Sequence, residues 1–150
     1  MSTASSRLTR EPVPGPDLIV RACLCLLIMI SGLALRRFGF GLGLPALVVK
    51  YGGSALWAAM VFFLVAIAAS HMSRLTLALI SAAIAIGVEL FRLVHAPWLD
   101  AFRLTLAGAL LLGRVFSLWN MLAYSVGIVL AVWLDRLAMR ACTPTPHSAS

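Results

Sequence analysis

Charged residues are scarce in this chain of 150 residues. Only 11% of its residues are charged and 62% are apolar, whereas a soluble domain has about 25% charged and about 45 to 50% apolar residues. A soluble fold of this length would leave large apolar patches facing water. The mean hydropathy of +1.02 therefore excludes a soluble globular protein and indicates a protein whose solvent is lipid.

Acidic residues are the rarer charged type, because 5 aspartates and glutamates stand against 12 lysines and arginines, giving a net charge of +7. The basic residues are scattered singly between apolar runs, whereas nucleic-acid binding needs them gathered in a patch or stripe. We therefore expect no nucleic-acid partner.

Residues that bind metals or form disulfides are also few. Three cysteines are too few and too irregularly spaced for a disulfide framework or a zinc site. The histidines are dispersed, with no i, i+4 pair. The six residues are Cys23, Cys25, Cys142, His71, His95 and His147. We predict no metal and no cofactor.

Four apolar segments are candidates for membrane spans: 18–35, 51–69, 75–88 and 118–134. Together they predict an all-α, polytopic transmembrane helix bundle. The first segment has only Arg21 near its start, and that long side chain is expected to reach the membrane interface. Because Arg7 and Arg10 precede this segment and small residues end it, a cleaved signal peptide is the alternative.

The ends of the chain are polar. Residues 1–17 contain serines, threonines and alternating prolines, a composition that does not pack a core, so we predict a disordered tail there. We expect the transmembrane bundle over residues 18–135 and a polar tail over 136–150. Residues 36–50, with three alternating glycines and Pro45, are expected to form a turn-rich connector.

The segment from 95 to 117 has a different pattern, with a ten-residue apolar run at 104–113. Ten helical residues rise roughly 15 Å, about half the hydrocarbon thickness of a bilayer. We predict a short re-entrant or interfacial helix, and a fifth span is the alternative.

Basic residues beside the spans predict the orientation. Four spans would place six on each side, with Arg7, Arg10, Arg21, Arg74, Arg136 and Arg140 on one and Arg36, Arg37, Lys50, Arg92, Arg103 and Arg114 on the other. If acidic or amide partners hold Arg92, Arg103 and Arg114 inside the fold, the balance becomes six against three. We then expect both termini in the cytoplasm and the bundle in a bacterial inner membrane.

Small residues recur every four positions on two of the spans. Ala123, Gly127 and Ala131 share one face of the last span, and Ala83 and Gly87 share a face of the third. Such faces let helices approach closely in lipid. We expect helix contacts there, and a homo-oligomer joined through the Ala123, Gly127 and Ala131 face is possible. The chain has no evident internal repeat, so an inverted-repeat transporter has little support.

Polar residues near the span ends meet in one leaflet if there are four spans. The candidate ligand-binding set is Tyr51, Ser54, Glu89, Arg92, Arg103, Arg114 and Asn120. Glu89 and Arg92 are three residues apart on one helix face and can pair. The pair either neutralises itself for structural reasons, or belongs to an outward-facing pocket in which Arg103 and Arg114 hold an anion.

Two segments resemble a known family. "KYGGSALW" and "VELFRLVHAPWLDAFRLTLAGALLLGRVFSLWNMLAYSVG" resemble the bacterial membrane proteins catalogued as domain of unknown function 2809, over roughly 18–135. The family pattern maps onto Tyr51, Gly53, Glu89, Arg103, Phe116, Leu118, Trp119, Tyr124 and Gly127. This chain departs from it at Ser54 and Asn120, where the family usually has Asp, and at Arg92, where it usually has Gln.

A weaker likeness links the chain to VanZ-like proteins through Glu89, Arg103, Asn120 and Gly127. That resemblance implies a role with cell-envelope lipids.

These observations favour a membrane protein that binds an anionic envelope lipid or a lipid-linked head group. The alternatives are a lipid-modifying enzyme that uses Glu89, or a purely structural or accessory membrane protein. An enzyme has less support, because the sequence has no Ser-His or His-carboxylate constellation at the required spacing.

Overall fold

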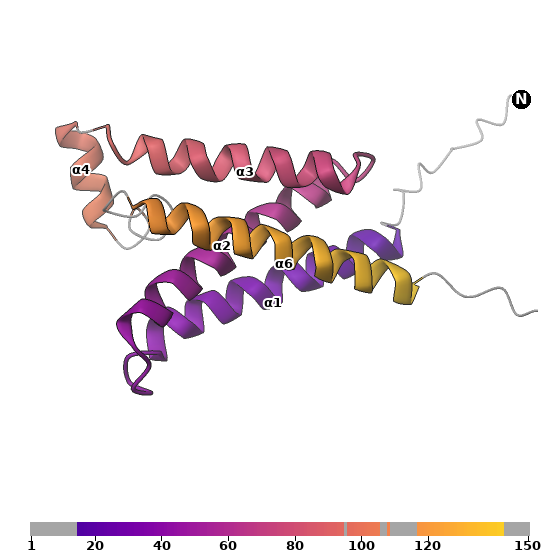
Figure 1. Ribbon diagram of the computed structural model, residues 1–150, viewed down its shortest axis with the longest axis horizontal. Helices are drawn as coiled ribbons and strands as arrows, with labels where there is room; N and C mark the ends of the chain where they lie inside the picture. Colours follow the sequence, from indigo (N-terminus) through magenta and orange to yellow (C-terminus); the bar gives the residue numbers. More distant parts are fainter. Residues whose placement is uncertain (1–14, 95, 106–107, 109–116, 143–150) are drawn as a thin grey trace, which may run out of the picture.

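The computed structural model describes residues 15–94, 96–105, 108 and 117–142, and all regular structure in these ranges is helical (Figure 1). The helices are α1 (Pro16–Phe38), α2 (Ala46–Ala68), α3 (Arg74–Phe91), α4 (Pro97–Leu104) and α6 (Leu118–Cys142). Four of them, α1, α2, α3 and α6, are long and apolar enough to cross a membrane. The predicted all-α transmembrane bundle of four spans is confirmed for the described residues.

Helix ends follow local signals. Pro16 begins α1, since a proline at the first position loses no hydrogen bond. Ser73 caps α3 by accepting a hydrogen bond from the backbone N–H of Thr76 at 3.2 Å. The second span starts earlier than predicted, at Ala46 directly after Pro45. As a result Lys50 lies on a helix and not in the connector.

The last helix is longer than predicted, since α6 continues past Asp135 to Cys142. Seven residues of the predicted polar tail are therefore helical. The predicted disordered tail lies almost wholly outside the described residues, apart from the start of α1.

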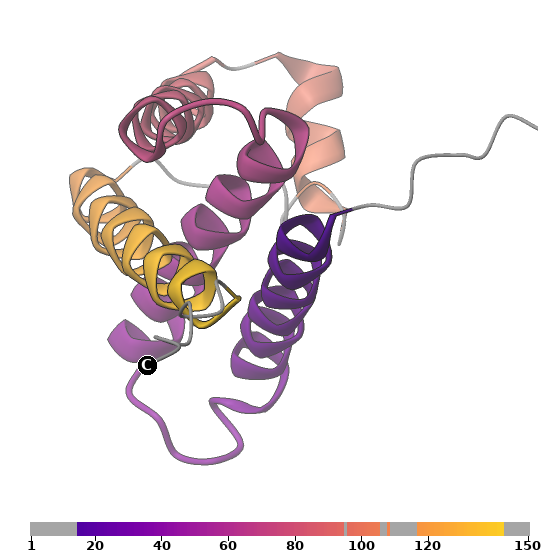
Figure 2. The same cartoon turned by 90° about the vertical axis from the view of Figure 1, so that its right-hand side faces the viewer.

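The core of the bundle is built around α2, which packs against α1, α3 and α6 (Figures 1 and 2). Phe62 and Phe63 of α2 are fully buried, with ring centroids 5.4 Å apart in an edge-to-face arrangement. Leu77 of α3 and Ala131 of α6 complete this core and are also fully buried. Helix α2 is therefore the central helix of the bundle, and the outward faces of α1, α3 and α6 around it are apolar.

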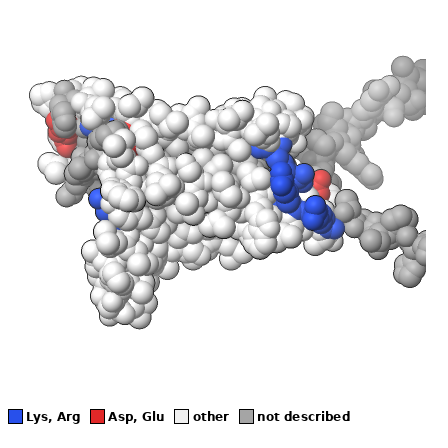
Figure 3. All heavy atoms as spheres, viewed as in Figure 1, with Lys and Arg blue, Asp and Glu red and all other residues white. Residues whose placement is uncertain are grey.

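Large apolar side chains on those outer faces are exposed, among them Leu27, Ile30, Leu79 and Val129. On the face shown in Figure 3, charged atoms gather at the two ends of the bundle and a broad uncharged band separates them. An apolar band between charged ends matches a bilayer, whose hydrocarbon core solvates the band while the charges reach the interfaces.

Short helix α4 lies across one end of the bundle in Figure 1. Its eight residues rise roughly 12 Å, which is too short to span the hydrocarbon core. Most of the apolar run at 104–113, on which the predicted re-entrant helix and its five-span alternative depend, lies outside the described residues.

The small-residue face of α6 packs inside the chain. Ala131 is fully buried and Ala123 nearly so, and a Cβ built on Gly127 would collide with the backbone of Ala55 in α2. The predicted helix contact is therefore confirmed at α6. Because the chain itself covers this face, an oligomer, which stays a prediction, would need another surface.

The second small-residue face behaves differently. Ala83 is exposed, and a Cβ on Gly87 would meet no atom within 4 Å. The contact predicted on the third span is therefore wrong within the described part of the chain, because this side of α3 faces outward.

These two glycines give a matched test of packing. Gly127→Ala is expected to lower the free energy of unfolding by about 1 to 3 kcal/mol, because backbone must shift to admit the methyl group. Gly87→Ala should leave it nearly unchanged. Unfolding of the purified protein in mixed detergent micelles measures both, and equal effects would contradict the α2–α6 contact.

Candidate functional site

A buried polar cluster is centred on Glu89, in the last turn of α3. Its side chain has no exposed surface, although a carboxylate within a membrane protein is costly to bury without partners. Helices α2 and α6 bring polar side chains to the same place, because Asn120 lies in the first turn of α6 and meets Ser54, which lies about two turns into α2. All three residues belong to the predicted site, and the structure brings them together.

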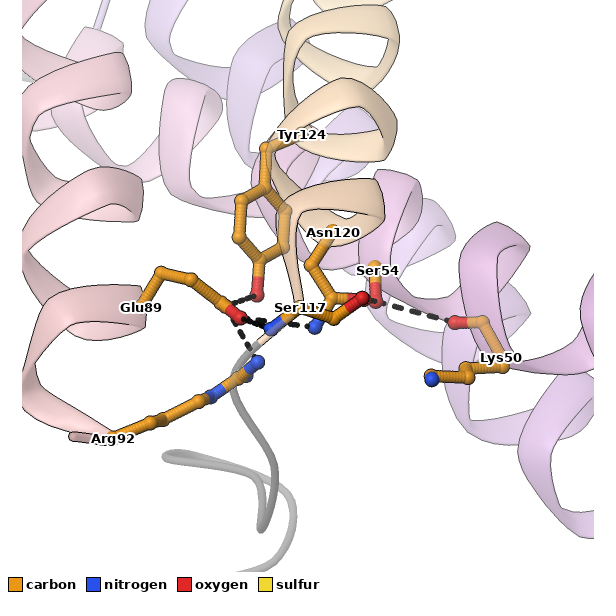
Figure 4. Close-up of polar contacts among 7 residues, drawn as sticks. All are labelled: Lys50, Ser54, Glu89, Arg92, Ser117, Asn120 and Tyr124. Atoms are coloured by element: carbon orange, nitrogen blue, oxygen red, sulfur yellow. Dashed lines mark hydrogen bonds and ion pairs between the residues drawn. The ribbon is translucent and has the colours of Figure 1, made fainter.

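Glu89 accepts four hydrogen bonds (Figure 4). Oε1 accepts from the backbone N–H of Ser117 at 2.7 Å and from Nδ2 of Asn120 at 3.2 Å. Oε2 accepts from the hydroxyl of Tyr124 at 2.9 Å and from Nη1 of Arg92 at 2.5 Å. The predicted Glu89–Arg92 pair is confirmed, and these contacts fasten α3 to the start of α6.

The cluster continues from α6 to α2. The Ser54 hydroxyl lies 3.4 Å from Oδ1 of Asn120 and 3.2 Å from the backbone oxygen of Lys50, so its one hydrogen serves either acceptor. Figure 4 shows the side chain of Lys50 extending from α2 along the same side as the Ser54–Asn120 pair. A chain of polar contacts therefore runs across three helices and ends beside a lysine.

The arrangement restricts what Glu89 can do chemically. A carboxylate offers about four lone-pair positions, and four donors occupy them here. A general base needs a lone pair directed at a substrate proton. Glu89 is therefore placed as a structural anchor, with its charge balanced by Arg92.

Three predicted site residues remain: Tyr51, Arg103 and Arg114. Tyr51 is half-buried on α2, and its ring lies 5.1 Å from Nζ of Lys50 in a cation–π contact. Arg103 belongs to α4, but its side chain is outside the described part of the structure, and Arg114 is wholly outside it. Their predicted role as anion ligands stays a prediction.

Three participants were missed by sequence reasoning: Ser117, Tyr124 and Lys50. Tyr124 had a signal, since it follows Asn120 by four residues and so shares its helix face. Ser117 contributes only a backbone N–H at the start of α6, which no side-chain pattern reveals. Lys50 was assigned to the connector, but it lies in the first turns of α2, which begins at Ala46.

A second buried ionic cluster lies near the other ends of α1 and α6. Asp135 has no exposed surface and pairs with Nε of Arg21 at 2.8 Å and with Nε of Arg74 at 2.8 Å. Arg21 also donates to the backbone oxygen of Ala66 at 3.0 Å. The expectation that Arg21 reaches the interface is wrong, because its guanidinium turns inward to a carboxylate 114 residues away in the sequence.

A family model described as a protein of unknown function (DUF2809) matches residues 43–128. The chain belongs to the DUF2809 family. The matched segment includes α2, α3 and the first half of α6, and is narrower than the 18–135 expected from the resemblance. It therefore contains the whole Glu89 cluster but neither Arg21 nor Asp135. No solved structure matches the chain.

The family resemblance bears on the charge balance of the cluster. The resemblance implies that this chain departs from the usual family residues at Ser54, Arg92 and Asn120, and all three lie within the contact chain around Glu89. By that resemblance, neutral groups replace two carboxylates and a cation replaces one neutral group. The contact chain of this DUF2809 protein consequently holds one negative and one positive side chain, which balance.

Proposed function

We propose that this integral membrane protein binds the head group of an anionic cell-envelope lipid at the end of the bundle that holds the Glu89 cluster. The membrane character and the DUF2809 membership rest on the four apolar helices and the family match. The lipid ligand is the step beyond them. The observation that carries it is an excess of cations beside a cluster that is already neutral.

The described charged side chains at this end divide into those that have a charged or polar partner and those that have no carboxylate partner. Asp100 of α4 belongs to the first group. Glu89 is balanced by Arg92, whereas Arg36, Arg37 and Lys50 form no ion pair with any carboxylate in the described ranges. Three such cations at one membrane interface attract phosphate or carboxylate head groups. Lys50 is the best placed, because its backbone oxygen lies 3.2 Å from the Ser54 hydroxyl and its side chain extends along the same side as the Ser54–Asn120 pair.

The two alternatives fit the contacts less well. An enzyme that uses Glu89 needs a free lone pair on that carboxylate, and the four donors leave none. A purely structural protein accounts for Glu89 but gives no role to the unpaired cations other than as interfacial anchors.

The orientation stays part of the proposal, with both termini in the cytoplasm of a bacterium and the Glu89 end facing outward. The structure changes the charge argument, because Asp135 holds Arg21 and Arg74 just as Glu89 holds Arg92. If Arg21, Arg74 and Arg92 are all left out of the count, and Arg103 and Arg114 are left out as before, four basic residues remain on the side of the termini and three on the other side.

Replacing Lys50 tests the proposal. In lipid nanodiscs or detergent, Lys50→Gln is expected to weaken binding of phosphatidylglycerol about tenfold, or about 1.4 kcal/mol, with no effect on phosphatidylcholine. The matched control is Arg136→Gln, which removes an exposed charge near the opposite end of α6. Native mass spectrometry of retained lipid measures both variants.

Equal affinities for the anionic and the zwitterionic lipid in the parent protein would overturn the proposal. Conversion of the added lipid to a new species, abolished by Glu89→Gln, would favour the enzyme instead.

A further inference from the structure

An apolar groove lies between α1 and α2. Its volume is about 180 Å³, and its lining is apolar except for Arg36. Gly32 and Gly53 form part of its wall, and the missing side chains at these positions leave room between the two helices. In a bilayer the groove opens among acyl chains, not into water.

Arg36 closes one end of this groove. Its side chain lies over Gly53, with Nε 3.0 Å and Cζ 3.8 Å from the position that a Cβ on Gly53 would take. The residue is exposed and has no carboxylate partner in the described ranges. The groove therefore has an apolar body and a planar cation at its end, and that cation lies in the last turn of α1.

Two aromatic rings in contact lie between the groove and the Glu89 cluster. Trp57 lines the groove, and its ring centroid lies 5.5 Å from that of Tyr124. The hydroxyl of Tyr124 in turn donates a hydrogen bond to Glu89. A ligand in the groove would thus contact the same wall that supports the polar cluster.

An apolar groove of this kind is filled in a membrane. Left empty, its lining would lose dispersion contacts, and water would find no polar partners along the apolar walls. An acyl chain supplies those contacts, while the guanidinium of Arg36 matches a phosphate by two parallel hydrogen bonds. The occupant with both properties is a single anionic phospholipid.

We infer that one acyl chain of an anionic phospholipid occupies the α1–α2 groove, with its phosphate held by Arg36. The inference rests on the proposed function and deepens it, because it makes the hydrocarbon chain as necessary for binding as the head group. A soluble phosphate ester that shares the head group but lacks the chain would bind poorly.

Two substitutions test the groove, and each has a matched control. Gly32→Leu places a branched side chain in the groove, whereas Gly87→Leu places the same side chain on an open face of α3. Arg36→Gln removes the closing cation, whereas Arg136→Gln removes an exposed cation near the opposite end of α6. If Gly32→Leu fails to accumulate, Leu33→Trp, at an exposed position of the lining, fills the groove instead.

The probes are dioleoyl phosphatidylglycerol and glycerol phosphate, added to the full-length protein in detergent. Gly32→Leu and Arg36→Gln are each expected to weaken phosphatidylglycerol binding about tenfold, while both controls bind as the parent does. Glycerol phosphate in large excess should not displace the lipid. Retained lipid is quantified by native mass spectrometry, and melting temperatures confirm that each variant is folded.

The outcomes separate this inference from the proposed function. If Lys50→Gln weakens binding while Gly32→Leu and Arg36→Gln do not, the groove assignment is wrong and the head-group proposal stands. If Gly32→Leu and Arg36→Gln weaken binding while Lys50→Gln does not, the groove is the site and the Lys50 assignment fails. Displacement of the lipid by glycerol phosphate, or no effect of any substitution, overturns the groove.

Discussion

Asp135→Asn is expected to be the most damaging single substitution in the protein. It leaves Arg21 buried at 7% exposure without a counter-charge, and breaking a buried pair costs about 3 to 5 kcal/mol. Arg21→Gln should cost a similar amount, because it removes the buried counter-charge of the Asp135 carboxylate. Arg74→Gln should cost less, since the Arg74 side chain is 40% exposed and is screened by solvent.

Detergent unfolding and the amount of protein recovered from membranes measure these effects. The control is Arg136→Gln, at the exposed position next to Asp135. Combining Asp135→Asn with Arg21→Gln should recover part of the loss, because the double variant buries no uncompensated charge. Additive losses in the double variant would show that Arg21 and Asp135 are not energetic partners.

Glu89→Gln is expected to have the second-largest effect, lowering the free energy of unfolding by about 3 kcal/mol or more. The amide would keep one acceptor oxygen, but its NH₂ group would be brought among donors such as Tyr124 and Arg92. The positive charge of Arg92, whose side chain is 11% exposed, would also lose its partner.

Combining Glu89→Gln with Arg92→Gln should restore much of the stability, because the unbalanced charge disappears. The restoration stays incomplete, since the Ser117 N–H and the Asn120 amide still face a weaker acceptor. The same unfolding measurements complete the double-mutant cycle. If the double variant loses as much free energy of unfolding as the two single variants lose together, Glu89 and Arg92 are not energetic partners.

The two ionic clusters show different degrees of predictability. Glu89 and Arg92 lie three residues apart on one helix, so their pairing follows from helix geometry alone. Arg21 and Asp135 are 114 residues apart and meet only because α1 and α6 both pack near the end of α2. The Glu89–Arg92 pair was predicted. The Arg21–Asp135 pair was not, because Arg21 was expected to reach the membrane interface.

The two small-residue faces also differ in a way that their spacing does not predict. Ala123, Gly127 and Ala131 and the pair Ala83 and Gly87 have the same four-residue spacing. Among the helices that the structure describes, only the first face meets another one, where the backbone of Ala55 leaves no room for a Cβ. The spacing predicts that a close approach is possible, but the neighbour that makes it comes from the packing of the whole bundle.

The amino-acid pattern was sufficient to predict a lipid-embedded protein, its helical class and its four spans, because long apolar runs satisfy their backbone polar groups in lipid only as helices. It also predicted that Ser54, Glu89 and Asn120 lie close together. The packing of the helices was needed to show that Glu89 accepts four hydrogen bonds, that Asp135 joins three helices, and that a groove beside Arg36 lies between α1 and α2. These features depend on the distance and rotation between helices, and hydrophobic periodicity carries no information about either.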